Sequence, residues 1–176
     1  EFPEEKAVYL SRLGINQMTD QGFAAHLSKF VHSDVFPFQA PPKADFQRKV
    51  KEMSAICAKY GIDFYVLAIE PGLDEVAGSY DSYPKEALGK VRPPWGGGKD
   101  GLAPTLCVNS PVAQEHLRNM MKKLVREYPD VKRAQLYNLD VNTWLCTPEL
   151  CERCREVCEE SSQRVFNPWE LQAKLV

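Results

Sequence analysis

The order of elements in this sequence predicts an α/β fold with a parallel sheet, and in more detail about half of a (β/α)₈ barrel. The first observation is a repeated succession of helical stripe, turn and apolar strand, which is typical of parallel sheets. The second is the run 64–69, which is almost wholly apolar, as in a strand covered on both faces. The third is that 176 residues suit one domain but fall short of the roughly 200–250 of a complete barrel.

In the first half of the chain, helices are expected where apolar side chains recur at a spacing of 3.6 residues. Gly14 and Gly61 stand where two of these helices should end. Asp45 is in the position of a helix cap. These criteria predict helices at 4–13, 22–31 and 46–60, and strands at 15–18 and 64–69.

The second half begins with a long excursion at 73–104, rich in Gly, Pro and aromatic residues, which we expect to be a loop insertion. Ser110 and Pro111 then suit the cap and first position of a helix. Pro168 breaks the last helical pattern. The expected elements are strands at 105–108 and 133–139, and helices at 111–128, at about 149–165 and after Pro168.

Composition bears on the class of partner. The net charge is −2 and Lys and Arg are not clustered, so no nucleic-acid partner is expected. No apolar run approaches the ~18 residues of a membrane span. The chain begins without Met and ends within a predicted helix, so we expect residues 1–176 to be one incomplete barrel domain. Half a barrel exposes strand edges, which predicts association with the remaining half or with a second copy. No compartment is assigned.

Polar side chains follow the predicted strands, and the carboxyl ends of parallel strands are where chemistry gathers. Glu70 follows one strand and Asp140 another. Paired carboxylates with amides and aromatic rings suit a carbohydrate, because carboxylates act on glycosidic bonds. We predict Asp140 and Glu70 as catalytic residues. The predicted substrate-binding residues are Asn16, Trp95, Tyr137, Asn138, Asn142 and Trp144. Each also has a plainer interpretation, as a helix cap, a turn residue or a solvated loop residue.

Four cysteines gather as Cys146-x₄-Cys151-x₂-Cys154-x₃-Cys158. Thiolates at such spacing can close a tetrahedral zinc site. The same face can instead pack into the core, or two of the four can pair as a disulfide. Cys107 stands apart in apolar surroundings. No other cofactor is required by the sequence.

Several segments, taken in order, resemble barrel glycosidases of the β-hexosaminidase and α-glucuronidase-like group over roughly residues 45–158. The segments that carry the resemblance are Ile69-Glu70-Pro71-Gly72, Leu106-Cys107-Val108-Asn109-Ser110-Pro111, Tyr128-Pro129-Asp130, Gln135 to Asp140, and Cys151-Glu152-Arg153-Cys154.

The resemblance implies a carbohydrate-active barrel and a glycoside hydrolase, with a carbohydrate as substrate. One departure matters, because those enzymes carry an Asp-Glu pair with Glu as the general acid, whereas Val141 follows Asp140 here. That departure favours the alternative, a non-catalytic sugar-binding or scaffold module with a structural zinc at the cysteines.

Overall fold

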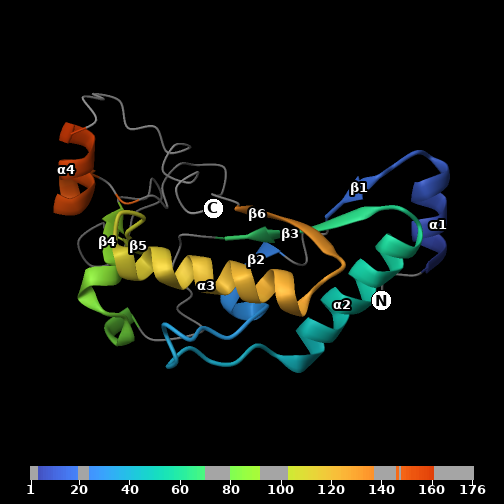
Figure 1. The fold of residues 1–176 in the computed structure, drawn as a ribbon, viewed down its shortest axis with the longest axis horizontal. Helices are drawn as coiled ribbons and strands as arrows, with labels where there is room; N and C mark the ends of the chain where they lie inside the picture. Colours follow the sequence, from blue (N-terminus) through green and yellow to red (C-terminus); the bar gives the residue numbers. More distant parts are fainter. Residues whose placement is uncertain are drawn as a thin grey trace.

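The structure is a computed structural model that describes residues 4–19, 24–69, 80–91, 103–136, 146 and 148–160. Figure 1 shows the arrangement of its elements. The helices are α1 (Glu4–Arg12), α2 (Ala44–Lys59), α3 (Pro111–Glu127) and α4 (Glu152–Glu160). The strands are β1 (Gln17–Met18), β2 (Ala24–Ala25), β3 (Asp63–Ala68), β4 (Leu88–Val91), β5 (Ala103–Leu106) and β6 (Val131–Leu136). Single 3₁₀ turns are η2 (Leu27–Lys29), η3 (Tyr80–Ser82), η4 (Lys85–Ala87) and η5 (Pro148–Leu150).

The main sheet is parallel and is centred on β3. Along one edge of β3, β1 pairs with its first residues and β2 with its last. Along the other edge, β6 pairs with β3 over nearly its whole length. Helix α2 leads into β3 and α3 leads into β6, so the predicted α/β fold with a parallel sheet is confirmed.

The main core lies between this sheet and the helices, and it explains why these residues form these helices. Val50, Met53 and Cys57 recur along one face of α2 and are buried, while Leu117, Met120 and Leu124 do the same on α3. Both stripes pack with the β3 side chains in one cluster. Removing that apolar surface from water is the principal driving force for this half of the fold.

Caps and glycines set the helix ends. The Ala113 amide donates to the Ser110 hydroxyl, with Pro111 in the first turn, as predicted. Gly14 and Gly61 follow α1 and α2 with φ of +77° and +70°, a conformation that glycine adopts without the steric penalty of a Cβ. Asp45 is not the cap of α2, because the helix begins earlier and Lys43 occupies that position. Its carboxylate instead pairs with Arg48 and Lys49.

A second, antiparallel sheet lies at the end of the molecule away from α1 (Figure 1). It consists of β4 and β5, paired from Leu88 opposite Leu106 to Val91 opposite Ala103. The prediction of a loop throughout 73–104 is therefore wrong at 88–91, where the chain forms a strand. The prediction of a helix at 22–31 is also wrong, since the described part of that range holds β2 and η2.

The half-barrel prediction is not borne out by the described residues. They form a small parallel sheet, in which β1 and β2 share one edge of β3, and a separate two-stranded antiparallel sheet. A barrel needs its strands to continue around a closed ring. The observed architecture is therefore a small α/β arrangement, and a barrel is not part of it.

A satellite cluster packs the β4–β5 sheet against α3 and the segment that precedes α2. Phe36, Tyr83 and Leu106 are buried together there, and His116 of α3 stacks on Phe36 with ring centroids 4.4 Å apart. The His116 side chain is 2% exposed. Its Nδ1 lies 2.8 Å from the Ser33 hydroxyl oxygen, and this hydrogen bond makes the burial of the ring tolerable.

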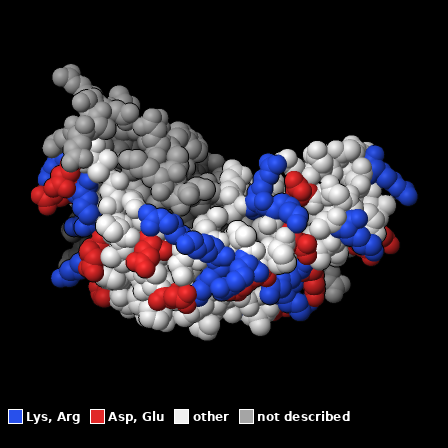
Figure 2. All heavy atoms as spheres, in the orientation of Figure 1, with Lys and Arg blue, Asp and Glu red and all other residues white. Residues whose placement is uncertain are grey.

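The described surface carries charges of both signs. In the face shown in Figure 2, Lys and Arg side chains are interspersed with Asp and Glu and with uncharged residues. Among the described helices, none is both long and apolar enough to cross a bilayer.

One buried carbonyl links three elements of the main core. Phe30 O accepts hydrogen bonds from the Tyr128 hydroxyl at 2.7 Å and from Gln47 Nε2 at 2.8 Å. Burial raises the pKa of Tyr128 to about 12, so the hydroxyl remains protonated and donates. Residues just after η2, within α2 and just after α3 are thereby held together.

Tyr128→Phe should lower the free energy of unfolding by about 1 kcal/mol, because a buried hydrogen bond is lost while the ring stays packed. Urea unfolding followed by circular dichroism measures the change. Tyr9→Phe is the matched control, since Tyr9 is 61% exposed, and should leave stability unchanged. Equal stability of both variants would contradict the role given to this hydrogen bond.

Candidate metal centre

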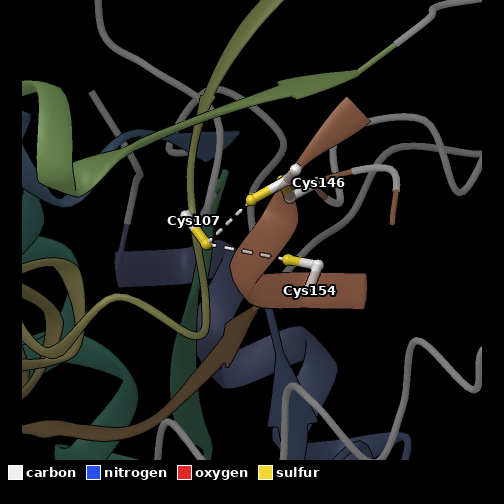
Figure 3. A group of neighbouring side chains, drawn as sticks. Cys107, Cys146 and Cys154 are labelled. Carbon is white, nitrogen blue, oxygen red and sulfur yellow. Dashed lines mark hydrogen bonds between the residues drawn. The ribbon is translucent and has the colours of Figure 1, made fainter. Parts of the chain in front are cut away.

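Four cysteine sulfurs converge at the end of the molecule where the β4–β5 sheet meets α4. The Sγ atoms of Cys107, Cys146, Cys151 and Cys154 all lie within 4.8 Å of one another, and all four residues are buried. Cys107 Sγ is 3.6 Å from Cys151 Sγ and 3.6 Å from Cys154 Sγ. Figure 3 shows the Cys107 sulfur facing those of Cys146 and Cys154. We refer to these four residues as the cysteine quartet.

These distances suit one tetrahedral metal ion. A zinc ion bonded to sulfur at about 2.3 Å places neighbouring sulfurs about 3.8 Å apart. A disulfide would bring two sulfurs to about 2.05 Å, whereas the quartet cysteines are free. The disulfide interpretation left open by the sequence therefore does not describe this structure. The prediction of a possible metal site at clustered cysteines is confirmed to the extent that four close sulfurs can bind an ion.

Local structure explains how the quartet is assembled. Cys107 directly follows β5, and its amide donates to Ala87 O at 2.8 Å, which ties it to the end of η4. Cys151 and Cys154 are one helical turn apart at the start of α4, where the Arg155 amide donates to Cys151 O. The Cys-x₂-Cys spacing at a helix start is common in structural zinc sites.

Gly89 of β4 makes room for the quartet. A Cβ at this position would lie 2.4 Å from Cys146 Sγ and 3.4 Å from Cys107 Cβ. Glycine within a strand often marks a close approach of the backbone to another group. Here it lets β4 pack directly against the Cys146 sulfur.

Two side chains with N–H donors contact the quartet. Asn109 Nδ2 donates to Cys154 Sγ at 3.4 Å. The Arg153 guanidinium lies at Cys107 Sγ and donates through Nη2 to Leu88 O at 2.7 Å. Its Nε is buried and has no hydrogen-bond partner among the described residues. Because this part of the half-buried guanidinium is shielded from water, negative charge on the nearby Cys107 sulfur would stabilise it.

The pKa values of three quartet thiols shift in different directions. Hydrogen bonds from Cys146 and Cys154, with a contribution from Arg153, lower the pKa of Cys107 far below its usual range. Contact with Cys107 raises the pKa of both Cys146 and Cys154. These opposite directions follow from the hydrogen bonds that the coupled sulfurs share. Full deprotonation of all four requires a cation among them.

Cys57 gives the contrast within the same chain. It is buried in the main core, where loss of hydration alone raises the pKa of its thiol to about 11. Such a thiol is an inert apolar side chain. Burial by itself therefore raises the pKa of a thiol and does not explain the lowered pKa of Cys107.

Sequence reasoning named three members of the quartet and missed the fourth. Cys107 was interpreted as an isolated core residue, because nothing in its spacing links it to cysteines 39 or more residues later. The side chain of Cys158, which was predicted as the fourth ligand, lies outside the described residues, although its backbone belongs to α4.

The predicted carbohydrate site is mostly beyond what the structure describes. The residues outside the described ranges are Glu70, Trp95, Tyr137, Asn138, Asp140, Asn142 and Trp144. Asn16 is described and exposed, and its carbonyl accepts from the Asp63 amide at 2.9 Å. It therefore lies at the amino ends of the parallel strands. Catalysis by Asp140 and Glu70 stays a prediction.

Comparisons with protein-family models, with curated proteins and with solved structures found no match to this chain. The resemblance to barrel glycosidases is therefore wrong: no family supports it, and the described strands form a small open sheet with a separate antiparallel pair.

Gly89→Ala should weaken metal binding at the quartet, because the added methyl group would displace Cys146 Sγ. Lys90→Ala is the control, since Lys90 is the next residue of the same strand and is exposed. Competition with a chromogenic chelator measures zinc affinity in both. We expect a loss of at least about tenfold for Gly89→Ala, comparable to disturbing an outer-shell partner, and none for Lys90→Ala. Equal affinities would show that Cys146 is not a ligand.

Proposed function

We propose that the cysteine quartet binds one zinc ion and that the domain is a non-catalytic scaffold which this ion holds in shape. The observation that carries the proposal is the convergence of four buried sulfurs within 4.8 Å. Four sulfur donors in a tetrahedron select zinc or iron among the common metals. An iron–sulfur cluster places several atoms between its cysteines and so needs a wider arrangement of sulfurs than a single ion does.

The donor set favours a structural role. Catalytic zinc sites keep one position for water or substrate, whereas structural sites are closed by four protein ligands. Here all four ligands would come from the protein, and three of the four residues are fully buried. Such an ion has no free position from which to act as a Lewis acid on a substrate.

The ligands also join parts of the chain that are distant in sequence. Cys107 stands between β5 and α3, while Cys151 and Cys154 belong to the segment that forms α4. The sulfur contacts span 44 and 47 residues. The Arg153 bond to Leu88 O adds a second link from α4 to β4. The ion would therefore fix η5 and α4 to the β4–β5 sheet.

The full chain, expressed and purified without chelator, should contain one zinc ion per molecule by mass spectrometry of the intact protein and by elemental analysis. Removing the ion should abolish hydrogen-exchange protection in 148–160, because metal binding free energy acts as folding free energy. Protection in α2 and β3 should persist, since their core contains no quartet member. Absence of bound metal, or iron in place of zinc, would refute the proposal.

Cys→Ser at each quartet position tests the ligands one at a time. Each variant should lose zinc, and with Co²⁺ in place of zinc each should lose the absorption typical of a tetrahedral thiolate site. Cys57→Ala is the control, because it removes a buried thiol from the main core; it should destabilise the fold and retain the metal. Zinc content that is unchanged in any quartet variant would remove that residue from the site.

A further inference from the structure

The four quartet residues are all buried, but they differ slightly in exposure to solvent. Cys107, Cys146 and Cys154 are 0% exposed, whereas Cys151 is 8% exposed. Cys151 also lines a cavity of about 470 Å³, large enough for a small organic molecule. Leu150, Glu152 and Arg153 line it on the side of α4, and Tyr83, Leu88 and Lys90 on the side of β4.

The sulfurs also differ in the groups that donate hydrogen bonds to them. The Arg153 guanidinium forms its side-chain hydrogen bond with Cys107, whereas its interaction with Cys151 and Cys146 is through charge alone, and Asn109 Nδ2 donates to Cys154 Sγ. Cys146 Sγ has the backbone of Gly89 packed against it, with no room for even a methyl group. Within the described part of the chain, the hydrogen-bond contacts of Cys151 Sγ are with the sulfurs of Cys107 and Cys146, and no N–H group donates to it.

These differences decide which thiolate can react. The thiolate is the nucleophile in cysteine chemistry, and its reactivity follows both electron density and access. A donor N–H draws electron density from the sulfur and occupies a lone pair, so shielded thiolates are poorer nucleophiles. Cys151 is the quartet member that is both unshielded by such a donor and open to a cavity.

We propose that Cys151 is the covalent modification site of the metal centre, and that it reacts with small soft electrophiles that enter the adjacent cavity. This inference rests on the proposed zinc site. With an alkyl halide, a sulfur lone pair forms the S–C bond while the halide leaves with the electrons of the carbon–halogen bond. The product is a neutral thioether, a weaker ligand than the thiolate, so modification loosens zinc. The cavity thus makes one ligand of an otherwise closed site addressable.

The test uses the zinc-loaded full chain with iodoacetamide at less than one equivalent. Peptide mass spectrometry orders the modification among the four quartet cysteines, and a metallochromic dye follows zinc. We expect Cys151 to be modified first and zinc to be released at the same rate. Earlier or equally fast modification of Cys107, Cys146 or Cys154 would overturn the proposal. Zinc content is measured beforehand, so a chain without zinc refutes both proposals, whereas a zinc-loaded chain labelled elsewhere refutes this one alone.

Matched variants test the shielding. Arg153→Gln keeps a donor for Leu88 O but removes the cation, so alkylation of Cys107 should accelerate several-fold while that of Cys151 stays as it was. Asn109→Ala should do the same for Cys154. Arg155→Gln is the control, because Arg155 is on the same helix, is 51% exposed at its side chain and pairs with Glu152. A general loosening of the site would accelerate all four cysteines together, and that outcome would overturn the shielding argument.

Discussion

Repulsion among four closely packed thiolates is the constraint on which the β4–α4 end of this molecule depends. Buried sulfurs within 4.8 Å of one another cannot all be charged without a cation, since like charges at that distance in a medium of low dielectric repel strongly. Contact among the sulfurs lowers the pKa of Cys107 and raises the pKa of Cys146 and Cys154. The Arg153 guanidinium favours negative charge at Cys107, and a divalent ion bound among the sulfurs would reduce their repulsion further.

With zinc bound as proposed, two different sources of stability would operate in one chain. The parallel sheet with α2 and α3 is held by an apolar core of aliphatic and aromatic side chains. The cluster that holds α4 contains cysteines alone, and α4 itself is short. Structural zinc in finger peptides contributes about 10–16 kcal/mol, comparable to the whole stability of an ordinary domain at about 5–15 kcal/mol. A zinc ion at the quartet would stabilise the part of the molecule around α4, as apolar burial stabilises the parallel sheet.

The parts of the fold that the sequence predicts well are those governed by local pattern. The stripes of α2 and α3, the cap at Ser110 and the glycines after α1 and α2 all act within a few residues, so their signals are visible without tertiary information. The predictions fail where the structure of a segment depends on residues that are distant in the sequence. The 22–31 stripe gives way to β2 because Ala24 and Ala25 pair with the end of β3. Strand β4 forms because β5 pairs with it. Cys107 meets the other three cysteines only in the folded chain. A glycine at position 89 is compatible with a close packing contact, but the sequence does not identify Cys146 as the residue that makes it.

The distance along the chain between Cys107 and Cys154, 47 residues, has a consequence for biosynthesis. A ribosome adds about 5–20 residues per second, so Cys107 leaves the exit tunnel several seconds before the last of its three partners. During that interval α3 and β6 emerge and can complete the parallel sheet, while no complete site for an ion exists. Binding of one ion by all four sulfurs would therefore have to wait until Cys154 has emerged, after the segments that form the parallel sheet. An order of events follows directly from where one cysteine stands in the chain.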